Sequence, residues 1–134
     1  MKKFILFIAV ALCFASAQAQ PKVLTWASYG NDSDTLNNTT SETTETATVG
    51  KNAGFSATVT LTLISGTSGG KIYWEGSNKN GNFVPVDSAT MTQQNFSSNT
   101  YKYSAAPFMY HTFRVRIVPT GTQSQRIVGA LFKQ

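Results

Sequence analysis

The chain has 134 residues, 13% of them charged, a formal net charge of +5, one histidine and one cysteine. That length fits one domain with a single hydrophobic core. One histidine and one cysteine are too few for a zinc site. The basic residues form no cluster larger than Arg114 and Arg116, which argues against nucleic-acid binding. We therefore expect no metal, no cofactor and no nucleic-acid partner.

Residues 1–19 have the order of a secretory signal peptide. A lysine pair precedes an apolar run over 4–14, and Ala17-Gln18-Ala19 fits the small-x-small cleavage pattern. The run is shorter than the roughly 20 residues that a membrane span needs. We expect cleavage after Ala19, no membrane span afterwards, and an exported domain over 20–134 in the periplasm, at the cell surface or outside the cell. This domain would keep nine basic and six acidic residues, a net charge of +3.

The first half of the mature chain contains one clear strand. Over Phe55–Leu63, five apolar residues alternate with serine and threonine, so a strand would bury one face and expose the other. Val23–Tyr29 predicts an earlier strand. The polar stretch 31–49 predicts a long loop or a polar edge strand. Cys13 lies inside the signal, which leaves the mature chain without a disulfide.

The second half predicts further short strands separated by Gly, Asn and Pro turns, at 71–77, 83–86, 100–104, 110–118 and 126–133. Pro85 lacks an N–H group and places its strand at a sheet edge. Because no window shows a helical period, we expect one all-β antiparallel sandwich of about eight strands, jelly-roll or immunoglobulin-like. Five residues should point inward: Val59, Leu61, Trp74, Val115 and Ile117.

No catalytic site is expected. Two carboxylate pairs, Glu42 with Glu45 and Glu75 with Asp87, have the residue types of a glycoside hydrolase, but nothing in the sequence supplies a cleft between them. A single histidine, His111, supports no Ser-His-Asp arrangement and is expected to be an ordinary strand or rim residue.

Asp32 and Asp34 resemble half of a calcium loop. The next alternate position of that pattern needs Asp or Asn, and this chain has Leu36. An Asx-type turn is therefore the favoured interpretation.

The candidate contact surface consists of aromatic and arginine residues on strands. Aromatic side chains on a β face can stack on sugar rings or anchor a protein, although they can equally fill the core. Arg114 and Arg116 are two residues apart, so both lie on one side of a strand, as ligands of an acidic partner or as a solvated face. We expect the surface for a protein partner or a surface glycan to consist of Tyr73, Tyr101, Tyr103, Arg114 and Arg116.

Six segments together resemble small β-sandwich proteins of tailed phages and prophages, particularly those associated with Bacteroidetes. The segments are Asp34–Asn38, Ile72–Asn78 with Gly81–Val86, and Thr112–Ile117 with Thr120–Gln125 and Val128–Leu131. The resemblance covers about 100 residues, nearly all of the mature chain. It implies a virion-associated structural role without catalytic residues.

Two functions therefore stay open. The first is an exported, non-enzymatic structural or adhesive β-sandwich related to phages, with self-association left open. The alternative is a secreted carbohydrate-binding module. Capsid and tail genes beside its gene would favour the first function, and genes for polysaccharide-degrading enzymes would favour the second.

Overall fold

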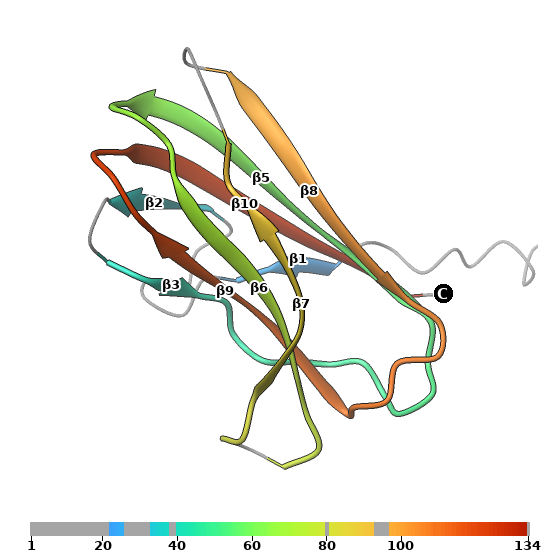
Figure 1. The fold of residues 1–134 in the computed structure, drawn as a ribbon. Coiled ribbons are helices and arrows are strands. Elements are labelled where there is room, and N and C mark those ends of the chain that lie inside the picture. The colour runs from blue at the N-terminus through green and yellow to red at the C-terminus, as the bar shows by residue number, and fades with distance from the viewer. Residues whose placement is uncertain (1–21, 26–32, 38–39, 80, 93–96, 134) are drawn as a thin grey trace, which may run out of the picture.

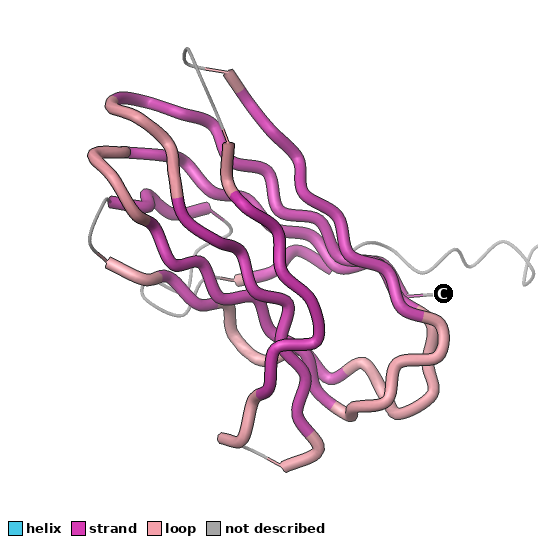
Figure 2. Tube along the Cα trace, in the orientation of Figure 1, coloured by secondary structure: helices cyan, strands magenta, loops and turns pink. Residues whose placement is uncertain are grey.

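A computed structural model describes residues 22–25, 33–37, 40–79, 81–92 and 97–133. The expected signal peptide lies outside these residues. Every regular element among them is a strand (Figures 1 and 2). The strands are β1 (Lys22–Leu24), β2 (Ser33–Asn37), β3 (Glu42–Thr43), β4 (Ala47–Thr48), β5 (Phe55–Ser65), β6 (Gly70–Ser77), β7 (Val84–Thr90), β8 (Ser98–Ala105), β9 (Thr112–Pro119) and β10 (Ser124–Lys133).

The strands form two five-stranded antiparallel sheets that pack face to face (Figure 1). The first, called the β5 sheet, has the order β1–β10–β5–β8, with β2 also pairing with β10. The second, called the β6 sheet, has the order β3–β9–β6–β7, with β4 also pairing with β9. The predicted all-β sandwich is confirmed. In the part of the chain that the structure describes, no helix is long and apolar enough to cross a membrane.

Alternating side chains build the core between the sheets. In β5 the apolar positions from Phe55 to Leu63 are buried, while the serine and threonine residues between them stay partly exposed. In β9 the same period buries Phe113, Val115 and Ile117 and turns the two arginines outward. All five residues predicted to point inward are at most 1% exposed, which confirms the predicted register.

The polar stretch 31–49 is the part where the structure adds most. Its described residues contain three short strands, β2, β3 and β4, which pair with β9 or β10 at the sheet edges. The stretch also contributes Leu36, Ala47 and Val49 to the core. Backbone hydrogen bonds to a sheet edge need no particular side chain, so such strands give little sequence signal.

The strand boundaries differ from the predicted ones by one or two residues in β8, β9 and β10, and by more in β7. β7 runs to Thr90, well beyond the predicted end at residue 86, because its partner β6 continues to offer hydrogen bonds. It is an edge strand, as Pro85 predicted. The strand predicted over Val23–Tyr29 is described only as far as Leu24, and residues 26–32 lie outside the described part.

Candidate functional site on the outer face of the β6 sheet

The outer face of the β6 sheet combines charged, aromatic and hydroxyl side chains. Antiparallel pairing sets Tyr73 opposite Arg116 and Glu75 opposite Arg114. Directly paired residues lie on the same face of a sheet. Trp74, between the two β6 residues, points into the core and is 1% exposed. The alternation therefore brings all four of these side chains to one outward surface.

Glu75 holds both arginines through one carboxylate. Arg114 donates from Nε to Oε2 of Glu75 at 2.7 Å, and Arg116 donates from Nε to Oε1 at 2.8 Å. The Glu75 side chain is 3% exposed, whereas the two arginine side chains are 29% and 32% exposed. The arginines thus cover the carboxylate and remain partly open to solvent themselves.

Each guanidinium also packs over an aromatic ring. The Cζ atom of Arg114 lies 4.0 Å from the ring centre of Phe83, and that of Arg116 lies 4.5 Å from the ring centre of Tyr73. Cation–π contact adds to the ion pair and fixes the plane of each guanidinium. We call Tyr73, Glu75, Phe83, Arg114 and Arg116 the arginine cluster.

The end of β6 next to this cluster has no room for a side chain at residue 76, which is a glycine. A Cβ atom on Gly76 would meet Cδ2 of Tyr110 at 2.5 Å and Cζ of Phe108 at 3.0 Å. The ring of Tyr110 can therefore pack directly on the backbone beside Glu75 only because residue 76 has no side chain.

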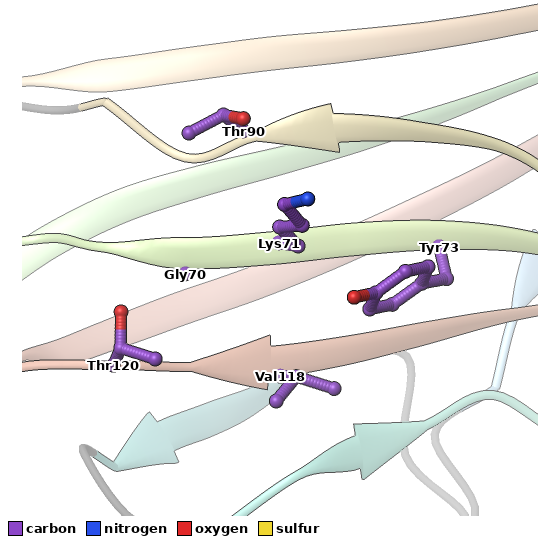
Figure 3. A pocket seen from close by; sticks show the side chains of 6 residues that line it. All are labelled: Gly70, Lys71, Tyr73, Thr90, Val118 and Thr120. Atoms are coloured by element: carbon purple, nitrogen blue, oxygen red, sulfur yellow. The ribbon is translucent and has the colours of Figure 1, made fainter.

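A groove of about 350 Å³ lies next to the arginine cluster (Figure 3). It is lined by Gly70, Lys71 and Tyr73 of β6, Thr90 of β7, Val118 of β9 and Thr120 after β9. In Figure 3 the Tyr73 ring extends across the space between β6 and β9. Tyr73 therefore belongs to both features, and it joins the groove to the arginine cluster.

Gly70 is needed at one end of the groove. Its φ is +120°, and a Cβ there would collide with the carbonyl oxygen of Val118 and lie 2.7 Å from Cε of Met91. The close approach of β6 and β9 at this end therefore requires glycine.

Two of the predicted surface residues lie elsewhere. Tyr101 and Tyr103 pair with Val59 and Ala57, so they face the interior and pack against the core, which makes their predicted outward placement wrong. The Tyr103 ring stacks on Trp74 with centres 5.9 Å apart. The small side chain of Ala57 leaves room for an aromatic neighbour, a packing effect that strand alternation does not reveal.

Burial raises the pKa of the Tyr103 phenol, and the nearby carboxylate of Asp87 and the phenol of Tyr110 add to the rise. Tyr103 therefore stays neutral at physiological pH and acts as a packing residue.

The carboxylate pairs are not arranged for hydrolysis. Glu75 faces outward in the arginine cluster, whereas Asp87 is paired with Trp74 and lies on the opposite side of the sheet. Glu42 is buried opposite Ile117, while Glu45 is exposed.

The remaining candidates form no site among the described residues. His111 is exposed, and no group of three or more metal-ligating side chains occurs in the described ranges. Asp32 and the side chain of Asp34 lie outside the described part, so the structure does not test the Asx-turn hypothesis.

Sequence reasoning singled out Tyr73 but not the other residues that line the groove. Lys71 and Thr90 come to this face through pairing of β6 with β7, and Thr120 lies in the turn after β9. The period of two could have placed Lys71, Tyr73 and Glu75 on one face, because they alternate with Ile72 and Trp74.

Comparison with known proteins gives the fold. No protein-family model matches the chain, and no curated protein matches it. A carbohydrate-binding module of family 28, described as specific for non-crystalline cellulose, superimposes with a TM-score of 0.51 at 12% identity over 72% of this chain and 69% of that one. A family 4 carbohydrate-binding module has a TM-score of 0.51 at 5% identity over 90% of this chain and 82% of that one. The chain thus shares the β-sandwich fold of these modules.

Proposed function

We propose that this chain is an exported, non-catalytic carbohydrate-binding module that holds a glycan on the outer face of the β6 sheet. The groove beside Tyr73 carries the proposal, because it places an aromatic ring, two threonine side chains and an ammonium group around one hollow. The sandwich fold shared with two carbohydrate-binding modules supports it. The signal-like order of residues 1–19 supports export.

The chemistry of the groove suits a sugar. A pyranose ring presents an apolar face that packs on an aromatic ring, and its edge carries hydroxyl groups that exchange hydrogen bonds with polar side chains. Tyr73 would supply the aromatic contact, and Thr90 and Thr120 line the same groove toward its Gly70 end, on either side of β6. Ligand sites commonly combine such an apolar wall with a few polar groups that set orientation.

The test is a binding assay of the full chain, expressed with residues 1–19 in place, against a panel of soluble polysaccharides. Tyr73→Ala should lower affinity about tenfold or more, as loss of an aromatic anchor does. The matched control is Phe132→Ala, because Phe132 is an aromatic residue 37% exposed on the outer face of the β5 sheet.

Unchanged affinity of Tyr73→Ala, or loss of binding with Phe132→Ala alone, would show that the groove is not the site. Folded protein that binds no glycan in the panel would remove support for this function.

A structural or virion-associated role is the second candidate. The similarity to phage β-sandwich proteins stays a prediction from the sequence. One observation favours a protein contact: Val23, Val128 and Phe132, on neighbouring strands β1 and β10, are 37–41% exposed. Light scattering of the wild type and of Val128→Ser/Phe132→Ser would test self-association through this strip. A monomer in both cases would contradict it.

A further inference from the structure

We infer that the glycan bound by this face is acidic, carrying a uronic carboxylate or a sulfate ester that the arginine cluster and Lys71 recognise. This inference rests on the proposed function and narrows it to one class of ligand.

The charge on the outer face carries the inference. On β6, β7 and β9 of the β6 sheet, the charged residues whose register places them outward are Lys71, Arg114 and Arg116, against Glu75 alone. Asp87 of β7 pairs with inward-facing Trp74 and approaches Tyr103, so it does not neutralise this surface. Exposed Glu45 lies between β3 and β4, the short strands that pair with β9. Even with Glu45 counted, three cations against two carboxylates leave the face positive, and a positive surface attracts an anionic ligand.

The hydrogen-bonding state of the arginines points the same way. Both oxygens of Glu75 are engaged, each by one Nε atom. A guanidinium has five N–H groups, of which four are on the Nη atoms. Among the described residues, Arg114 and Arg116 make no hydrogen bond through these four groups. Two partly exposed guanidinium forks are therefore held in place with donors left for an outside acceptor.

The cluster is preorganised for such an acceptor. Phe83 and Tyr73 pack on the guanidinium planes, and Glu75 fixes Nε on each side chain. An arginine fork matches the two oxygens of a carboxylate or sulfate, and less conformational entropy is lost when the side chain is already fixed. Because two arginines share one carboxylate, the cluster keeps one positive charge that Glu75 does not neutralise.

The cluster also lies within reach of the groove. Tyr73 lines the groove and packs against Arg116, so a sugar resting on Tyr73 would have this guanidinium at its side. Lys71 is two residues from Tyr73 on the same face of β6, a separation of about 7 Å along the strand. An acidic substituent on a bound sugar could therefore meet Arg116 or Lys71.

The experiment compares matched charged and neutral polymers using the full chain. Polygalacturonate is compared with its carboxyl-reduced form, and κ-carrageenan with its desulfated form, which separates carboxylate from sulfate. We expect at least one charged polymer to bind about tenfold tighter than its neutral match, with affinity falling between about 20 mM and about 500 mM NaCl.

Variants separate recognition from stability. Lys71→Gln, at an exposed position outside the ion pairs, should weaken binding of the charged polymer about threefold to tenfold. It should leave the unfolding midpoint unchanged. Arg116→Lys keeps the positive charge but loses the planar guanidinium fork. It should therefore weaken binding of the charged polymer and leave binding of its neutral match unchanged. Lys133→Gln is the control, because Lys133 is an exposed lysine at the end of β10.

The outcomes separate the two claims. Equal affinity for a charged polymer and its neutral match would overturn the acidic-glycan inference and leave the proposed function standing. No binding to any of the four polymers, nor to other glycans, by folded protein would overturn both. Equal losses in Lys71→Gln and Lys133→Gln would show that only overall charge matters, which also overturns the inference.

Discussion

The outer faces of the two sheets are built on the same alternating pattern but carry different chemistry. On the β5 sheet, β5 and β8 present serine and threonine hydroxyls that hydrogen-bond across the strands. The Oγ1 atoms of Thr60 and Thr100 are 2.9 Å apart, and Oγ1 of Thr62 lies 2.6 Å from Oγ of Ser98. On the β6 sheet the same positions carry Lys71, Tyr73, Glu75 and the two arginines. On the first face these hydroxyls bond one another across strands, and the exposed Lys102 and Arg126 lie on β8 and β10 of that sheet. The second face gathers its cations on β6 and β9 around a carboxylate and beside a groove.

Substitution of a buried residue should destabilise the protein by a similar amount in either sheet. Leu61, beneath the threonine face, and Trp74, beneath the arginine cluster, are both at most 1% exposed. Trp74→Ala should cost about 3–5 kcal/mol and Leu61→Ala about 2–5 kcal/mol, through lost burial and the cavity that remains. Denaturant unfolding measures both. A cost below about 1 kcal/mol at either position would mean that this side of the core is packed differently.

Substitutions on the two outer faces should change the free energy of unfolding by different amounts. Arg114→Met/Arg116→Met leaves Glu75 covered and unpaired, which should cost about 3–5 kcal/mol. Adding Glu75→Met removes the buried charge and should restore most of that loss.

On the opposite face, Thr60→Ala removes only a cross-strand pair and should cost about 0.2–1 kcal/mol. If the triple variant were no more stable than the double variant, Glu75 would not be the group that the arginines stabilise.

The smallest expected effect is a pH dependence of stability at Tyr103, on the edge strand β8. The raised pKa of Tyr103 means that the folded state keeps the phenol proton to a higher pH than the unfolded chain does. Its contribution to stability is complete below the ordinary tyrosine pKa near 10 and is lost as pH rises through the raised value.

Tyr103→Phe keeps the ring and removes the proton. Its unfolding free energy should therefore fall less steeply than that of the wild type between about pH 9 and about pH 11. Parallel pH profiles would rule out this role for the phenol.

Strand periodicity predicted the interior well and the surface only in part. Over Phe55–Leu63 and around Val115 every second side chain is apolar, so burial follows directly from a period of two. Tyr73, Arg114 and Arg116 lie on one face of the β6 sheet because directly paired residues of neighbouring strands point to the same side. Tyr101 and Tyr103 also share a side, but an amphipathic tyrosine on an edge strand suits either face.

The groove could not be predicted from the sequence. Thr90, Val118 and Thr120 are adjacent only through the register between strands, which depends on the whole sandwich. For 31–49 the sequence predicted a long loop or a polar edge strand, and the described residues contain edge strands. Their number and partners depend on backbone groups of β9 and β10, which the side-chain pattern does not reveal.

The most direct test is to map which outer face a glycan contacts by backbone amide NMR, titrating the full chain with trigalacturonate and, separately, with cellotriose. We predict that shift changes gather at Lys71, Tyr73, Thr90 and Thr120, are larger with trigalacturonate, and leave Thr60 and Thr100 unmoved. Shift changes confined to the threonine face, or none with either sugar, would contradict a glycan site on the β6 sheet.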